Sequence, residues 1–120
     1  MTILELSKEK QIELLLQRKL FAEIDRLHPN TPSPERLLTI TRADVLGYLK
    51  ANPASAEAFF AEAGGGNSCP NWHDVPAIWK EGAKYKVACL DHGKPLGAVE
   101  EFSTLADSLA RYISLRFLND

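Results

Sequence analysis

Two cysteines and two histidines stand in paired spacings in the C-terminal half of the chain, as Cys69-x3-His73 and Cys89-x2-His92. Thiolate and imidazole suit the borderline-soft zinc ion, and two of each would complete a tetrahedral site. However, each pair mixes Cys with His, unlike the usual zinc-finger pattern, and Cys89 falls on the apolar face of a predicted strand over 84–90. We therefore expect no metal or other cofactor, and zinc binding by these four residues is the alternative.

Cys69 and His73 could also act as a thiol nucleophile and its general base. Such a pair needs a third group to orient the base. Asp74 is the sequence neighbour of His73, which is a poor position for orienting it. Pro70 removes a backbone N–H that could otherwise bind an oxyanion. The glycine run at 64–66 is not followed by the Gly-Lys-Ser/Thr of a phosphate-binding loop. We therefore predict that the protein is not an enzyme.

Acidic and aromatic residues flank the glycine run, and no Lys or Arg occurs from Ala51 through Trp79. Tryptophan often anchors the centre of a protein interface, and acidic groups attract a basic partner. We expect Phe59 and Phe60 to complete the core, which either tryptophan could equally do. The predicted partner-binding surface contains Glu62, Trp72, Asp74, Trp79, Glu100 and Glu101.

Helical segments that begin at Thr41 and Ser55, followed by a hairpin, could form a DNA-binding module with a wing. A recognition helix needs cations for phosphates and base edges, and the predicted helix over 55–63 has none. The formal net charge of -2 gives no bulk field that attracts nucleic acid or anionic lipid. We expect neither as a partner, and a helical nucleic-acid binder is the second alternative.

The length of 120 residues predicts a single domain over 1–120. Its parts are a helical part (1–63), a glycine joint with an aromatic loop (64–83) and a strand–strand–helix part (84–120). No apolar run approaches the ~20 residues of a membrane span. Two cysteines are too few for a disulfide framework, so we expect a cytoplasmic protein with reduced thiols.

Apolar spacings and cap residues predict the elements that hold these side chains. The expected helices begin at Ser7, Ser33, Thr41, Ser55 and either Ser103 or Thr104, and the first runs to about Leu27. The segment 75–79 is expected to be a short helical turn. Alternation over 84–90, a turn over 91–94 and a return strand over 95–102 predict a hairpin. The only candidate for a third strand is 37–41.

The C-terminal segment combines a strand (85–90), a turn (91–93), a strand that ends Glu100-Glu101-Phe102, and a helix with Leu105, Leu109 and Tyr112. This run resembles the C-terminal part of several small bacterial immunity proteins, which neutralise polymorphic or contact-dependent toxins. The resemblance implies a small cytoplasmic inhibitor that binds one protein tightly. It covers less than a third of the chain and assigns no functional residue.

These observations predict an α+β domain in which a helical N-terminal part packs on a β-hairpin and a C-terminal helix. The predicted function is binding of one protein partner. In the most concrete form, the chain is an immunity protein that occludes the active site of a cognate toxin domain with its acidic and aromatic surface.

Overall fold

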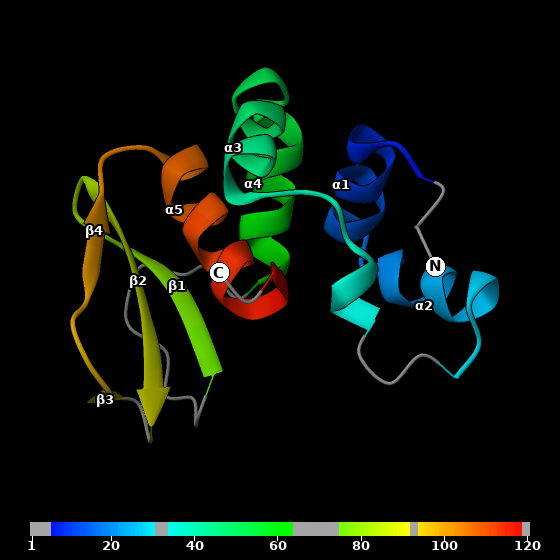
Figure 1. Cartoon of the computed structure of the whole chain (residues 1–120). Coiled ribbons are helices and arrows are strands. Elements are labelled where there is room, and N and C mark those ends of the chain that lie inside the picture. Colours follow the sequence, from blue (N-terminus) through cyan, green and yellow to red (C-terminus); the bar gives the residue numbers. More distant parts are fainter. Residues whose placement is uncertain (1–5, 31–33, 64–74, 92–93, 119–120) are drawn as a thin grey trace.

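The computed structural model describes residues 6–30, 34–63, 75–91 and 94–118 (Figure 1). These residues form an α+β fold with an antiparallel sheet, which confirms the predicted class. The elements are α1 (Lys8–Leu16), α2 (Leu20–Leu27), the 3-10 helix η1 (Pro34–Leu37), α3 (Arg42–Ala51), α4 (Pro53–Glu62), β1 (Val75–Glu81), β2 (Lys84–Asp91), β3 (Lys94–Pro95), β4 (Glu100–Phe102), α5 (Leu105–Ile113) and the π-helical turn η2 (Ser114–Leu118).

The molecule is layered from the sheet through α5 to the α3–α4 pair and then to α1 and α2 (Figure 1). One core joins these layers, and Ile78 and Val87 are the sheet residues in it. Phe59 is buried in this core and Phe60 packs against it, as predicted. The Phe60 ring also meets the Tyr85 ring edge-on at 5.7 Å, so α4 contacts β2 directly. No helix in the described ranges is long and apolar enough to cross a membrane.

The single helix predicted over 7–27 is wrong, because a corner separates α1 from α2. Arg18 has a φ of 60° at this corner. The Lys19 N–H donates to the Leu14 carbonyl at 2.8 Å, and the Arg18 N–H donates to the Leu15 carbonyl at 3.0 Å. These two bonds form a Schellman motif, in which glycine usually takes the left-handed position. With arginine there instead, the residue types give no sign of the corner.

The left-handed conformation of Arg18 predicts a difference between two variants that remove the same side chain. Arg18→Gly is expected to be more stable than Arg18→Ala by about 1 kcal/mol in the free energy of unfolding, because only glycine adopts this φ without a steric cost. Urea denaturation of the two variants, followed by circular dichroism, measures the difference. Equal or greater stability of Arg18→Ala would show that the corner is not strained.

Thr41 and Thr104 are confirmed as N-caps. Each hydroxyl accepts a hydrogen bond from the backbone N–H three residues further on, at 3.2 Å in both helices. The predicted cap at Ser55 is wrong, because α4 begins at Pro53 after Asn52. Proline fits the first helical position, where no N–H is needed and φ is already set, so this helix begins without a side-chain cap.

The helical turn predicted over 75–79 is also wrong, because these residues belong to β1. This strand pairs with β2 along its whole length, from Val75↔Leu90 to Glu81↔Lys84. The two-residue connection Gly82-Ala83 has φ 61° at Gly82, which suits a hairpin that follows the twist of the strands. A short apolar run fits either a helix or a strand, and here the adjacent strand decides.

The other side of β2 is covered in two short pieces rather than by one strand. β3 pairs at Leu90↔Pro95 and β4 pairs at Val87↔Glu100, so the return strand predicted over 95–102 is interrupted at 96–99. The segment 37–41 is not a third strand, since η1 ends at Leu37 and no strand follows before α3. β1 supplies the additional strand that covers the hairpin.

The predicted core face of β2 is only partly right. Val87 is buried against the helices, but Cys89 on the same face is exposed. On the opposite face, Ala88 and Leu90 are buried with Ala77 and Trp79 in a second apolar cluster. Both faces of the central strand therefore carry buried residues, which simple alternation of polar and apolar residues does not distinguish.

Candidate functional site

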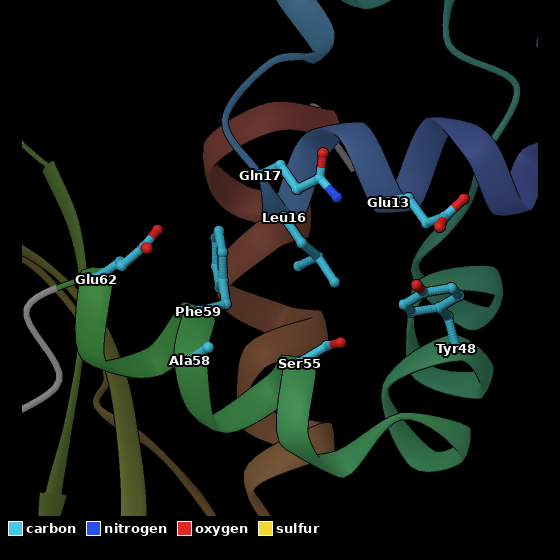
Figure 2. Close-up of a pocket in the computed structure, with 8 residues that line it drawn as sticks. All are labelled: Glu13, Leu16, Gln17, Tyr48, Ser55, Ala58, Phe59 and Glu62. Atoms are coloured by element: carbon cyan, nitrogen blue, oxygen red, sulfur yellow. The ribbon is translucent and has the colours of Figure 1, made fainter.

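A cavity of about 420 Å³ lies between α1, α3 and α4 (Figure 2). Its volume falls within the range of cavities that hold small ligands or single side chains of a partner. We call this cavity the acidic groove, and its lining residues are Glu13, Leu16, Gln17, Tyr48, Ser55, Ala58, Phe59 and Glu62.

Helical periodicity brings these side chains to one place. Residues three and four positions apart share a helix face, which places Glu13 and Leu16 of α1 together with Gln17, the residue that caps the end of this helix. The same spacing places Ser55 and Glu62 on one face of α4, with Ala58 and Phe59 between them. Figure 2 shows the Leu16 side chain pointing into the space between Phe59 and Tyr48. The groove thus has an apolar floor and a polar rim.

Glu13 gives one end of the acidic groove its negative charge. Burial raises the pKa of the Tyr48 phenol, and the charges of Glu13 and Glu9 raise it further. The phenol therefore stays protonated at neutral pH and can donate a hydrogen bond. Within the described part of the chain, the Glu13 carboxylate makes no hydrogen bond or ion pair. Its charge is available to a cation that enters the groove.

Glu62 lies at the other end of the groove, where α4 ends. Arg18 Nη2 donates to the Glu62 carbonyl at 2.8 Å, and Arg18 Nε lies 3.8 Å from Glu62 Oε2. The guanidinium is thereby placed at the negative end of the α4 dipole, which stabilises the helix. The Glu62 side chain is 61% exposed, so its ion pair with Arg18 is weak and leaves the carboxylate open to other partners.

Trp79 is not an exposed anchor, so this part of the predicted partner-binding surface is wrong. Its side chain is 2% exposed and packs in the second apolar cluster. The indole Nε1 donates to Glu81 Oε1 at 2.8 Å. The residue thus takes the core role that the sequence left open for it. Trp72 and Asp74 lie outside the described residues, and their place in a partner surface stays a prediction.

The predicted acidic residues are not gathered on one surface. Glu62 lines the acidic groove, whereas Glu100 and Glu101 lie on β4, across the molecule from α1 (Figure 1). Both glutamates on β4 already pair with cations. Glu100 Oε2 accepts from Arg111 Nε at 2.8 Å, and Glu101 Oε1 lies 3.0 Å from Lys86 Nζ. Only Glu62 of these three contributes to the groove.

Of the Cys/His set, the structure describes only Cys89, which is an exposed free thiol. Cys69, His73 and His92 lie outside the described residues, and so does the Cys69–His73 pair considered as nucleophile and base. Among the residues that are described, no cluster of three or more His, Cys, Asp or Glu could hold a metal ion. Zinc binding by the four residues stays an alternative prediction.

Sequence reasoning missed Glu13, Tyr48 and Ser55 as site residues. The helical spacing of Glu13, Leu16 and Gln17 could have shown that a polar edge accompanies the apolar stripe of the first helix. That α1 presents this edge to α4 depends on the corner at Arg18, which no residue type reveals. The groove therefore could be found only from the packed helices.

Comparisons with known proteins give no further guide to this site. No protein-family model matches the chain, and no curated protein and no solved structure matches it significantly. The acidic groove is therefore interpreted from its own residues and geometry.

Proposed function

We propose that this protein is a protein-binding module that takes a basic side chain of its partner into the acidic groove. In its most concrete form, it is an inhibitor of the immunity type, which covers a basic active site of a cognate bacterial toxin. The observation that carries the proposal is the Glu13 carboxylate, which has no counter-charge among the described residues and stands beside the protonated Tyr48 phenol above an apolar floor.

The groove suits the chemistry of lysine and arginine. Both side chains have an apolar stem and a cationic head, and both bury the stem when the head finds an anion. Leu16, Ala58 and Phe59 offer the apolar contact. The Glu13 carboxylate at one end of the groove, or the Glu62 carboxylate at the other, offers the head charge-assisted hydrogen bonds, which are about twice as strong as neutral ones.

Covering a basic site with an acidic groove explains inhibition by occlusion. A cation that a toxin uses to hold an anionic substrate would instead be paired in the groove. The substrate would then be unable to reach the active site or to pair with this cation. Complementary charge also speeds association and discriminates against acidic proteins. The resemblance of the C-terminal segment to immunity proteins supports the same reading, although it does not extend to the helices that form the groove.

The test compares two double variants that lose the same charge. Glu13→Gln with Glu62→Gln alters the groove, whereas Asp25→Asn with Glu57→Gln alters exposed carboxylates that do not line it. A partner captured with the tagged wild-type protein from its native host is then titrated with each protein by calorimetry. We expect the groove variant to bind about tenfold to a hundredfold more weakly and the control to bind like the wild type.

The partner's own activity provides the second readout. We expect the wild-type protein and the control variant to inhibit a catalytic activity of the captured partner at one-to-one stoichiometry, and the groove variant to inhibit it at higher concentration only. Equal affinity of the groove variant and the wild type would exclude the acidic groove as the binding site. A partner that binds but whose activity is unaffected would exclude inhibition.

A further inference from the structure

A second, smaller cavity of about 220 Å³ lies where the corner between α1 and α2 meets η2. We call it the arginine pocket, because Arg18 and Arg116 both line it. Its other lining residues are Leu15, Leu20, Phe21 and Phe117. The pocket thus combines two guanidinium groups with an apolar wall. Its charge is positive, whereas that of the acidic groove is negative.

The apolar wall of the arginine pocket is firmly built. The rings of Phe21 and Phe117 stack with centroids 5.9 Å apart and an interplanar angle of 30°. Leu15 and Leu20 behind them are 3% and 1% exposed, so they are fixed by the core. A planar or branched apolar group that enters the pocket therefore meets a preformed surface.

The two arginines leave the pocket with an excess of positive charge. Arg18 has Glu62 as an anionic neighbour, at 3.8 Å. Arg116 has its guanidinium 5.7 Å from the Phe117 ring centroid and makes no ion pair within the described ranges. Both arginines lie close to the Tyr112 phenol, whose pKa is raised by burial, and their charges oppose that rise. Two cations are therefore matched by one carboxylate.

We propose that the arginine pocket binds a small carboxylic acid with an aromatic or branched aliphatic body. The apolar body lies against Phe21 and Phe117, and the carboxylate pairs with Arg116 and with the free donors of Arg18. Guanidinium groups bind carboxylates through two parallel hydrogen bonds, which fixes the orientation of such a ligand.

The size and chemistry of the pocket favour this ligand over simpler ones. A cavity of about 220 Å³ is smaller than the range for drug-sized ligands and holds about one ring or branched chain with its carboxylate. An inorganic anion would leave the apolar wall in contact with water. A neutral hydrocarbon would leave Arg116, which already has a hydrogen bond with the Tyr112 phenol, without an ion-pair partner. Only a group that is both apolar and anionic satisfies both halves of the pocket.

The test titrates 3-phenylpropionate into the full-length protein and compares it with the neutral 3-phenylpropanamide. Calorimetry gives the affinities, and NMR shifts of the Phe21 and Phe117 rings locate the ligand. We expect the acid to bind at least about tenfold more tightly than the amide, since the amide lacks the charge. The protein partner of the acidic groove is absent from this experiment, so its outcome is independent of the proposed function.

Two arginine variants provide the matched comparison. Arg116→Gln removes an exposed cation from the pocket and is expected to weaken the binding of 3-phenylpropionate about tenfold. Arg36→Gln removes an exposed cation that does not line the pocket and is expected to leave binding unchanged. Equal binding of acid and amide, or equal loss in both variants, would overturn the proposal. Much tighter binding of an acetylated peptide that ends in a phenylalanine carboxylate would overturn the assignment to a free acid.

Discussion

Replacing Leu109 with alanine is expected to lower the free energy of unfolding by about 3 kcal/mol. Leu109 is 0% exposed and lies on α5, the helix between the sheet and the α3–α4 pair (Figure 1). The substitution removes buried apolar atoms and leaves a cavity. Residues on both sides of α5 would have to move to fill it. Because α5 contacts both layers, neither side can move without disturbing the other, which keeps the cost near the middle of the range for such changes.

A leucine on the surface provides the control for this prediction. Leu96 is 60% exposed, so Leu96→Ala is expected to change the free energy of unfolding by less than about 0.5 kcal/mol. Urea denaturation of the wild type and both variants measures the two changes under the same conditions. If Leu109→Ala cost no more than Leu96→Ala, α5 would not be the centre of the core.

The features that follow from local chemistry could be predicted from the sequence. Thr41 and Thr104 cap helices because a hydroxyl can accept the N–H three residues on, and this needs no distant partner. The apolar spacing of the C-terminal helix is likewise local, and of the three residues named on it Leu109 and Tyr112 are buried, whereas Leu105 is half-buried. The α+β class followed from the change between helical and alternating patterns along the chain.

The features that depend on distant partners were missed or misread. The strand β1 was read as a helical turn because its apolar run is short, although Gly82-Ala83 between two apolar runs is a hairpin signal that could have revealed it. The corner at Arg18 left no signal at all, since a positive φ at arginine is uncommon. Without that corner, α1 and α2 would form one rod and their packing would be different.

The candidate site shows the same limit. Glu62 was predicted as part of an acidic surface because of its closeness in sequence to the aromatic loop. In the structure it lines the acidic groove together with Glu13 and Gln17, which are far from it in sequence. Trp79 was assigned to the same surface by sequence proximity, yet the pairing of β1 with β2 buries it. Residues that are close in sequence were thus assigned to one surface, although the packed structure separates them.

Replacing Gln11 with leucine is expected to lower the free energy of unfolding by about 2 kcal/mol, although leucine is apolar and of similar size. Gln11 is 0% exposed on α1. Its Nε2 donates to the Leu6 carbonyl and to Thr39 Oγ1, both at 2.8 Å, and its Oε1 accepts from the Thr39 N–H at 3.1 Å. The variant would leave backbone groups without these partners, and a partly buried donor or acceptor that loses its bond costs more than the bond contributes.

Thr39→Val separates this effect from the loss of a single hydroxyl. It removes one of the three bonds but keeps the backbone N–H that Gln11 accepts, so we expect a loss of less than about 1 kcal/mol. In the double variant the effect of Thr39→Val should shrink, because its hydroxyl has already lost Gln11, and this non-additivity measures the coupling between the two side chains. Full additivity in urea denaturation would show that the bond between Gln11 and the Thr39 hydroxyl does not stabilise the protein, and the loss in Gln11→Leu would then come from its two backbone partners, the Leu6 carbonyl and the Thr39 N–H.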